Sequence, residues 1–454
     1  MCAILLLIAC LFAVVSGKEG LDAINATSGI RPEASHLPFA PIIKNVDSQG
    51  AGRVLQQYNV PATMAIVNGL FFSAASAGYF AKLNVGGRYY HLLLDTGSEL
   101  SWMQCQPCVS CYEQLDQPIF DLDAPSSALS KLSCDHPLCV NFLQRRCRPN
   151  GGGLCTYRLD YADLSFTKGV VVADTFSMIS GQSFSGMAFG CSHTSRVRFD
   201  IAAGVLGLGG RPLSFPSQLR SKGYASRFSY CLPRRLASPN SLLTFGAPIA
   251  PDTVFTPLVD NPSRLPLYQT YYYVNLVGIS VGGPRLTGVP PEIFQIDPDT
   301  GEGGTFIDSG STLTTLPSIA YQELRDAFRD AVAANAPQLI FDGNPILASY
   351  DTCYTLAGGL PHKHYMTEPT PDIVYHGVPS VVFHFARGAD LVPPPKNYLA
   401  PMTRHGSNTN LICLLFARSP DAATTLGNVL QQGFRFTFDI ENGQLGFTRD
   451  AEQC

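Results

Sequence analysis

Charged side chains are scarce in this sequence, and no segment concentrates charge of one sign. Only 15% of the 454 residues are Asp, Glu, Lys or Arg, and the formal net charge is -4. Proteins that bind nucleic acid or anionic lipid usually present clustered Lys and Arg side chains. The sequence has no long Lys/Arg run, so we expect no nucleic-acid partner.

Long apolar segments are also missing, with one short exception at the N-terminus. Residues 3–15 are apolar and precede Ser16 and Gly17, although the basic residues that usually open an export signal are absent. This stretch is short for a membrane span and has the length of a signal-peptide core. Residues 1–17 are therefore a predicted signal peptide. We expect a secreted protein without a membrane anchor, either extracellular or vacuolar.

Signatures of several other functional classes do not occur. The sequence has no Gly-x-Ser-x-Gly motif, and its glycine-rich segment 204–210 lacks the lysine of a phosphate-binding loop. His362 and His364 lie in a polar stretch in which no carboxylate or cysteine completes a metal site. We expect neither a cofactor nor a metal ion.

Cysteine, by contrast, is frequent. The chain has 14 cysteines, and Cys2 and Cys10 leave with the signal peptide. The remaining cysteines predict about six disulfides in an exported protein. The spacing Cys105-x-x-Cys108-x-x-Cys111 also resembles part of an iron–sulfur motif, but the further cysteine of such a run is absent. The predicted export favours disulfides.

The rest of the chain divides into a leader and a repeated region. Residues 18–76 contain no cysteine and carry four basic and four acidic side chains, and we interpret them as a removable pro-segment. Residues 79–98 and 272–311 each contain an aromatic pair, a Val-Gly-Gly triplet and an apolar run ending in Asp-Thr/Ser-Gly-Ser. This internal repeat predicts two similar lobes, residues 77–265 and 266–454.

The local patterns are mainly those of a β protein. Residues 92–94 and 305–307 are short apolar runs that lead into Asp-x-Gly turns, as buried strands do, and residues 272–276 alternate as in a strand. One helix is predicted to begin with Ser318 as its N-cap. Its apolar residues recur at helical spacing: Tyr321, Leu324, Phe328 and Val332.

The two repeated loops present one aspartate each, Asp95 and Asp308. Two carboxylates held close together cannot both ionise cheaply, so they share one proton. One can then take a proton from a water molecule while the other donates a proton to the carbonyl oxygen of an amide. Two unrelated Asp-containing β-turns are the alternative, but two copies inside a repeat favour a shared catalytic site.

The neighbouring loop residues fit this chemistry. Glycine permits a tight turn that brings backbone N–H groups near the carboxylates. The serine hydroxyls can hydrogen-bond the carboxylates, and the residues after the aspartates are placed to tie the loops together. The predicted supporting residues are Thr96, Gly97, Ser98, Ser309, Gly310 and Ser311.

On these residues the chain resembles the pepsin-like aspartic proteases, in particular the plant nepenthesin-type branch. The resemblance extends from about residue 77 to Cys454. It rests on residues 94–98, Trp102, the cysteine-rich insert 105–139, residues 189–191 and 228–231, and residues 307–311. It implies a mainly β, bilobal fold with the active-site cleft between the lobes and a β-hairpin flap over the cleft. It also implies endopeptidase activity on polypeptides at acidic pH without a cofactor, and we expect a monomer secreted to the apoplast or a vacuole.

The resemblance also implies a disulfide pairing, which the sequence alone leaves open. The implied pairs are Cys105–Cys108, Cys111–Cys191, Cys134–Cys155, Cys139–Cys147, Cys231–Cys454 and Cys353–Cys413.

The flap is where the chain departs from the family pattern. Tyr-Gly-Asp-Gly-Ser is usual, whereas residues 161–165 read Tyr-Ala-Asp-Leu-Ser. Tyr161 matches the tyrosine that covers bound peptide, and we expect Trp102 to line the cleft and support it; an ordinary strand tyrosine and a core tryptophan are the alternatives. Replacing two glycines removes conformational freedom at a tip that favours φ > 0, which predicts a stiffer flap.

A second functional class shares this fold. Some such proteins bind or inhibit glycoside hydrolases without cleaving anything, and these are expected to have lost part of the aspartate machinery. Both loops are intact here. We therefore expect an aspartic endopeptidase, with a non-catalytic glycoside-hydrolase binder as the alternative.

Overall fold

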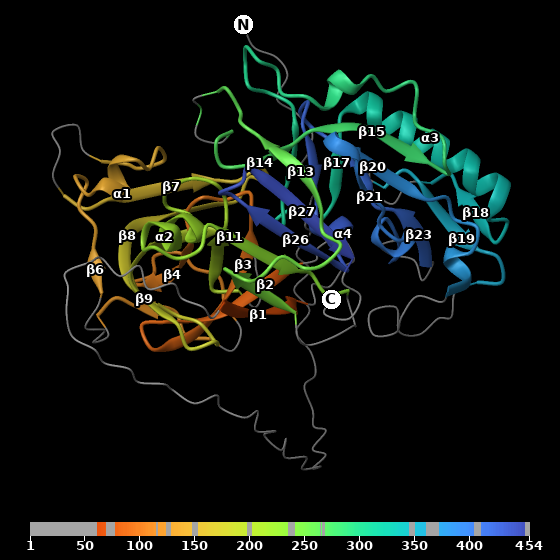
Figure 1. The fold of residues 1–454 in the computed structure, drawn as a ribbon. Helices are drawn as coiled ribbons and strands as arrows, with labels where there is room; N and C mark the ends of the chain where they lie inside the picture. Colours follow the sequence, from red (N-terminus) through yellow and green to blue (C-terminus); the bar gives the residue numbers. More distant parts are fainter. Residues whose placement is uncertain are drawn as a thin grey trace, which may run out of the picture. The chain divides into compact units, whose positions relative to one another are not determined.

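Strands dominate the architecture, in agreement with the mainly β fold class that the sequence predicts (Figure 1). The computed structural model describes residues 61–69, 78–114, 117–123, 129–147, 153–197, 202–234, 241–263, 265, 268–344, 350–359, 372–403 and 410–449. The predicted signal peptide, most of the predicted pro-segment, His362, His364 and Cys454 lie outside these ranges.

The elements fall into two halves of similar make-up. The first contains β1 (Ala62–Gly69), β2 (Gly78–Val85), β3 (Arg88–Asp95), β4 (Trp102–Gln106), β5 (Phe120–Asp121), β6 (Ser130–Lys131), α1 (Pro137–Val140), β7 (Thr156–Asp160), β8 (Phe166–Ser177), β9 (Ser183–Arg196), β10 (Gly204–Gly207), α2 (Phe215–Ser221), β11 (Arg227–Cys231) and β12 (Leu242–Phe245). The second contains β13 (Val254–Val259), β14 (Tyr272–Val274), β15 (Leu276–Val281), η1 (Pro291–Phe294), β16 (Thr305–Ile307), β17 (Thr314–Leu316), α3 (Ser318–Asn335), β18 (Leu339–Asp342), β19 (Cys353–Leu356), η2 (Asp372–Tyr375), β20 (Val381–Phe385), η3 (Ala386–Gly388), β21 (Ala389–Leu391), η4 (Pro395–Asn397), β22 (Leu399–Thr403), β23 (Asn410–Leu414), β24 (Phe416–Arg418), β25 (Thr424–Leu426), α4 (Asn428–Gln431), β26 (Phe434–Asp439) and β27 (Gln444–Arg449).

The internal repeat has a direct structural counterpart in the two halves. In the first, β3 runs parallel to β10, and Leu94 pairs with Leu206. In the second, β16 runs parallel to β25, and Ile307 pairs with Leu426. Each aspartate loop therefore leaves a buried strand that is held by a parallel neighbour from the same half.

A continuous antiparallel sheet joins the two halves. Its strand order is β1-β12-β11-β26-β27-β13, with the junction between β11 and β26. At that junction Phe228 is paired with Phe438, and their rings stack 4.5 Å apart at an angle of 3°. Stacked aromatic rings at this spacing bury a large apolar area, so this contact is a main apolar link between the halves.

The strand β1 lies inside the segment that the sequence analysis interprets as a pro-segment. It pairs with both β2 and β12. Ala62, Met64 and Ile66 are buried, at 0%, 0% and 2% exposure. A chain beginning at residue 77 would lack this strand. The end of the pro-segment at residue 76 stays a prediction.

Three other boundaries differ from the sequence-based expectation. β13 precedes the predicted lobe boundary at residue 265, yet it pairs with β14 and β27 of the second half. The single strand expected over 272–276 is two strands, β14 and β15, which join different sheets.

The start of α3 differs by one residue from the prediction. Ser318 is the first residue of α3 and Pro317 precedes it as the N-cap, because proline suits an extended backbone just before a helix. The predicted apolar face of this helix is confirmed by the burial of Tyr321, Leu324, Phe328 and Val332.

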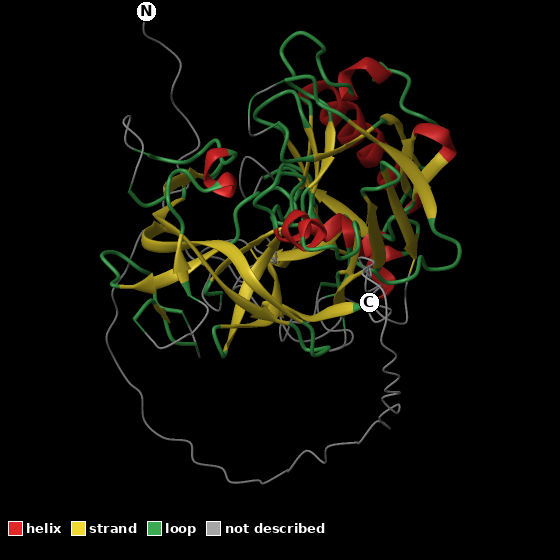
Figure 2. Cartoon of the chain, turned by 60° about the vertical axis from the view of Figure 1, so that its left-hand side comes forward, coloured by secondary structure: helices red, strands yellow, loops and turns green. Residues whose placement is uncertain are grey.

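In the described ranges helices are few compared with strands (Figure 2), and by residue number most of them belong to the second half. The longest, α3, packs against β15, β17, β18 and β24. None of the helices within the described ranges is long and apolar enough to cross a membrane.

The disulfide pairing implied by the family resemblance is wrong for two pairs near the start of the cysteine-rich insert. The structure joins Cys105 to Cys191 and Cys108 to Cys111, in place of Cys105–Cys108 and Cys111–Cys191. Strands β4 and β9 run side by side in parallel, and the Cα atoms of Cys105 and Cys191 lie 5.4 Å apart. This spacing is within the range for a disulfide.

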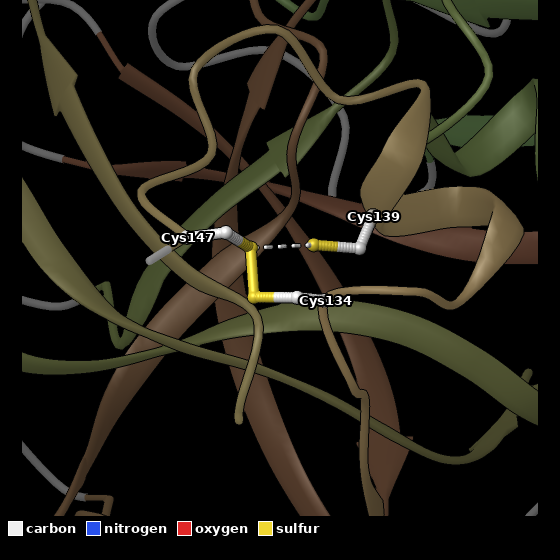
Figure 3. A group of neighbouring side chains, drawn as sticks. All are labelled: Cys134, Cys139 and Cys147. Carbon is white, nitrogen blue, oxygen red and sulfur yellow. Dashed lines mark hydrogen bonds between the residues drawn. A yellow bond between two sulfur atoms is a disulfide. The ribbon is translucent and has the colours of Figure 1, made fainter. Parts of the chain in front are cut away.

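The next two pairs are also exchanged. Cys134 is bonded to Cys147 and Cys139 to Cys155, in place of Cys134–Cys155 and Cys139–Cys147. Figure 3 shows the Cys134–Cys147 bond with the Cys139 sulfur close by, 3.9 Å from that of Cys147. With these sulfurs so close together, side-chain direction decides the pairing, and that direction is not encoded in cysteine spacing.

The last two predicted pairs lie in the second half. The predicted Cys353–Cys413 bond is confirmed, with strands β19 and β23 paired at these two residues. Cys231 is disulfide-bonded, but its predicted partner Cys454 lies outside the described residues.

Candidate active site

Both aspartates stand at the ends of short buried strands. Asp95 is the last residue of β3, and Asp308 directly follows β16. The backbone of each is fixed by the parallel neighbour strand: Leu208 N donates to Asp95 O at 2.8 Å, and Asp308 N donates to Leu426 O at 3.1 Å. The predicted repeat therefore delivers the two side chains from equivalent positions.

The residues after the aspartates tie the two loops together reciprocally. Thr96 N donates to Ser309 Oγ at 3.1 Å, and Ser309 N donates to Thr96 Oγ1 at 3.0 Å. The same hydroxyls then donate across the interface, Thr96 Oγ1 to Ile307 O at 3.0 Å and Ser309 Oγ to Leu94 O at 2.9 Å. These buried hydrogen bonds fix the distance between the loops.

Each carboxylate receives a matching pair of donors from its own loop. Gly97 N donates to Asp95 Oδ1 at 2.8 Å, and Gly310 N donates to Asp308 Oδ1 at 2.9 Å. Ser98 Oγ donates to Asp95 Oδ2, and Ser311 Oγ donates to Asp308 Oδ2 at 2.7 Å. The two sites are near copies of each other, as the repeated tetrapeptide predicts.

The glycines of the two loops are required by close approach. A Cβ atom on Gly97 would lie 3.0 Å from the Asp308 carboxyl group, and one on Gly310 would lie 2.5 Å from Asp95 Oδ1. Neither glycine has a positive φ. Their role is therefore to let each loop pass beside the other aspartate.

The environment keeps one carboxyl of the pair protonated. The two carboxyl groups are neighbours: a Cβ atom on Gly310 would lie 2.5 Å from Asp95 Oδ1 and 3.2 Å from Asp308 Oδ1. Burial and then the negative charge of Asp308 raise the pKa of Asp95 from 3.8 to about 8, against the opposing hydrogen bonds from Ser98 and Gly97. Asp95 is buried and Asp308 half-buried. Two adjacent carboxyls of which one holds a proton are what the repeated loops predict for a hydrolytic dyad.

Tyr161 lies beside the first aspartate loop. Trp102 is fully buried, and its Nε1–H donates to the Tyr161 hydroxyl at 2.6 Å. Burial together with the charge of Asp95 raises the pKa of Tyr161. Trp102 thus supports Tyr161, and Tyr161 stays protonated within reach of the dyad loop.

The turn after Tyr161 is tightly closed and strained at one residue. Tyr161 N donates to Ser165 O at 2.9 Å, and Leu164 N donates to Tyr161 O at 3.0 Å. Leu164 has φ 66° and is 70% exposed. This is a position where the family pattern has glycine, so the leucine occupies a left-handed conformation that disfavours a side chain. Arg196 Nη2 donates to Leu164 O at 2.9 Å and holds the turn.

Sequence reasoning missed two further groups at the site. Asn428 Nδ2 donates to Ser309 O at 3.1 Å, and Asn428 N donates to Ser311 O at 2.7 Å, so Asn428 supports the second loop. Asn428 follows the segment 425–427, Thr-Leu-Gly, which matches Val-Leu-Gly at 205–207 in the first half, and this match was a usable signal. Tyr271 stacks on Phe306, with ring centroids 4.2 Å apart, and burial and Asp308 raise its pKa. Tyr271 is one of three consecutive tyrosines, and nothing in the sequence distinguishes it from the other two.

The one side-chain group within the described ranges that has metal-like spacing carries no free ligands. It consists of Cys134, Cys139 and Cys147. All three sulfurs are in disulfides, of which Figure 3 shows Cys134–Cys147, and a disulfide sulfur is not the thiolate that binds zinc.

Comparison with known families gives two matches that together span most of the chain. Residues 79–247 match the family model "Xylanase inhibitor N-terminal", and residues 271–449 match "Xylanase inhibitor C-terminal".

Curated relatives are named as proteases. The chain is 38% identical over 387 residues to "Aspartyl protease family protein 2" of Arabidopsis thaliana, covering 84% of this chain and 72% of that protein. It is 32% identical over 387 residues to "Aspartic proteinase nepenthesin-1" of Nepenthes gracilis, covering 84% of this chain and 79% of that protein.

Solved structures share the fold at low sequence identity. The structure described as edgp matches with a TM-score of 0.66 and 16% identity, over 86% of this chain and 95% of that one. Conglutin gamma from lupine seeds matches with a TM-score of 0.60 and 17% identity, over 86% and 95%. The identities to the curated proteases show the family: this chain belongs to the pepsin-like aspartic proteases, in their nepenthesin-type branch.

Proposed function

We propose that the protein is an aspartic endopeptidase that hydrolyses peptide bonds through a water molecule activated between Asp95 and Asp308. The observation that carries the proposal is the pair of adjacent carboxyl groups, each with the same set of donors from its own loop. The membership of a family whose curated relatives are named proteases supports it.

The mechanism needs one ionised and one protonated carboxyl. The ionised group takes a proton from the water as the oxygen attacks the peptide carbonyl carbon, and the protonated group donates to the carbonyl oxygen. The substrate lies under Tyr161, which Trp102 holds in place. As pH rises through the raised pKa of Asp95 the shared proton is lost, so the activity belongs to acidic and not alkaline pH.

We further propose that the chain is made as a secreted zymogen and acts as a monomer on polypeptides in the apoplast or a vacuole. The predicted signal peptide at residues 1–17 and the disulfides support the exported state. Removal of the pro-segment would open the dyad to substrate.

A non-catalytic binder of glycoside hydrolases is the second candidate. The descriptions of the matching family models favour it, since both name a xylanase inhibitor. The solved neighbours include seed globulins, but at 17% identity they speak for the fold alone. The intact dyad favours the protease.

The deciding experiment is digestion of a denatured protein by the processed enzyme across acidic pH. Asp308→Asn is expected to abolish cleavage, while the exposed-carboxylate control Asp326→Asn keeps it, and a statine-type inhibitor should block the wild type. If disulfide-intact wild type shows no cleavage and instead inhibits a xylanase, the protein is a glycoside-hydrolase binder and the protease proposal fails.

A further inference from the structure

A buried ion pair directly follows the first catalytic loop and has no part in the mechanism above. Glu99 is the residue after Ser98, and its Oε2 accepts from Arg211 Nε at 3.1 Å. The side chains are only 2% and 10% exposed, respectively. Burial raises the pKa of Glu99, and the Arg211 charge and the Leu213 N–H oppose that shift.

Stability alone is a weak reason for such a pair. Removing two charges from water is costly, and a buried ion pair is often no more stabilising than apolar side chains of the same size. What the pair does provide is a fixed geometry, because Arg211 presents several donors in a rigid planar fork.

Arg211 uses that fork to reach three separate regions of the fold. It donates to Glu99 after the catalytic loop, to Gln269 Oε1 at 2.7 Å and to Asn141 O at 3.1 Å. Gln269 lies just before β14 of the second half, and Asn141 lies at the end of α1 in the cysteine-rich insert. One guanidinium thus joins the dyad loop, the second half and the insert.

The segment that carries Arg211 also lies between the first catalytic loop and the second half. Gly209 N donates to Ser98 O at 2.9 Å, and Gly210 N donates to Thr270 O at 2.8 Å. A Cβ atom on Gly209 would lie 2.9 Å from both of those carbonyl oxygens, so the segment is closely confined. The side-chain bonds of Arg211 to Glu99 and Gln269 link the same two regions that these backbone hydrogen bonds link.

We propose that Arg211 and Glu99 are positioning residues that fix the backbone of Ser98, so that its hydroxyl donates to Asp95 in the geometry that turnover needs. Three contacts carry the inference: the Glu99–Arg211 pair, the Gly209–Ser98 hydrogen bond and the Ser98–Asp95 hydrogen bond. The consequence for turnover rests on the proposed protease function, whereas the consequence for Asp95 does not.

The test compares Arg211→Met and Arg211→Lys in the full-length, processed protein. Misplacing a catalytic group slightly costs turnover more than binding. We expect Arg211→Met to lower kcat about tenfold with KM changed less than about twofold, and Arg211→Lys to retain an intermediate kcat. Because the Ser98 hydrogen bond lowers the pKa of Asp95, loosening it should also move the alkaline limb of the pH profile upward.

Two comparisons separate positioning from general stability. Arg329→Met removes an arginine that bonds Asp351 O and Thr352 Oγ1 in the second half, and it should lower stability without moving kcat or the pH profile. In a Ser98→Ala background, Arg211→Met should add less than about a twofold further loss, because both changes act on the same hydrogen bond.

The proposal is overturned if Arg211→Met leaves kcat and the alkaline limb at wild-type values, or if its effect is additive with Ser98→Ala. If Arg211→Met does not fold, kcat and the alkaline limb of Arg211→Lys are compared with those of wild type instead. If wild type does not cleave at all, the protease proposal fails separately. The positioning proposal is then decided by NMR titration of the Asp95 carboxyl, whose pKa should rise in Arg211→Lys and stay unchanged in Arg329→Met.

Discussion

Leu164 has a left-handed backbone conformation at the tip of the flap, with φ 66° and a side chain that is 70% exposed. That conformation costs a residue with a side chain about 1–2 kcal/mol, and so exposed a leucine regains little of it by burial. Asparagine adopts this region more readily, and a β-branched residue less so. We expect Leu164→Asn to raise the free energy of unfolding by about 0.5–1 kcal/mol.

The matched control for this change is Leu164→Val, which should lower stability, and urea unfolding measures both variants. If the free energy of unfolding were highest for Leu164→Val, lower for wild type and lowest for Leu164→Asn, the strain at this position would be absent. If the strained turn also limits flap movement, Leu164→Asn will change KM more than kcat.

The raised pKa of Asp95 predicts how stability depends on pH. Because its pKa in the folded state lies above its ordinary value of 3.8, the folded protein binds a proton that the unfolded chain releases. The contribution of Asp95 is fully present below about pH 4 and is lost as pH rises through about 8. Urea unfolding between these limits should show wild type losing stability with rising pH.

The variant Asp95→Asn isolates this effect, since its amide has no proton to lose. Its stability should fall less steeply than that of wild type over the same pH range. Parallel curves for the two proteins would mean that Asp95 is not the group responsible.

At the scale of elements, β1 provides a test of where the stable folded unit starts. Its pairing with β2 and β12 and the burial of Met64 and Ile66 make it part of the inter-lobe sheet. Burying two such side chains is worth about 1.5–3 kcal/mol each. We expect a chain beginning at residue 61 to fold, and one beginning at residue 77 to be less stable by several kcal/mol.

Thermal unfolding of the two truncated proteins, refolded with their disulfides, measures the difference. The chain from residue 61 is the matched control, because it lacks the same leader but keeps the strand. Equal midpoints would show that β1 is dispensable for the stability of the fold.

The sequence predicts an element well when the residues that specify it are close together in the chain. The strands that end at Asp95 and Ile307, and the helix with Leu324 and Phe328 on its buried face, follow from short-range apolar patterns. The disulfide partners do not, because Cys134, Cys139 and Cys147 all have sulfurs within 4.8 Å of one another, and only side-chain direction selects the bonds. Leu164 could be singled out from the altered motif, but its φ could not.

At the scale of the whole molecule, the paired aspartate loops were predictable because the sequence contains two nearly identical tetrapeptides, Asp-Thr-Gly-Ser at 95–98 and Asp-Ser-Gly-Ser at 308–311. Of the links between the halves, the Thr96–Ser309 hydrogen bonds were predictable from the same repeat, whereas the others were not. Phe228 and Phe438 meet across β11 and β26, 210 positions apart, and Arg211 reaches Gln269 through a side chain whose partners no motif marks. Pairings between distant segments depend on how the halves are arranged, and local periodicity carries no information about that.

The stack between Phe228 and Phe438 leads to a prediction about how the halves unfold. Truncating a buried phenylalanine to alanine costs about 3–5 kcal/mol. Phe184 offers a matched control, since it packs edge-on against Tyr224 within the first half, with ring centroids 5.3 Å apart. We expect Phe228→Ala and Phe184→Ala to lower stability comparably but to differ in cooperativity.

Differential scanning calorimetry distinguishes the two variants. Phe228→Ala weakens the contact that couples the halves, so its unfolding should broaden or split into two transitions, and cleavage should fall because the two aspartates come from different halves. Phe184→Ala should keep one transition and most of its activity below the melting temperature. A single sharp transition with full activity in Phe228→Ala would mean that the hydrogen bonds between Thr96 and Ser309 hold the dyad together without the aromatic stack.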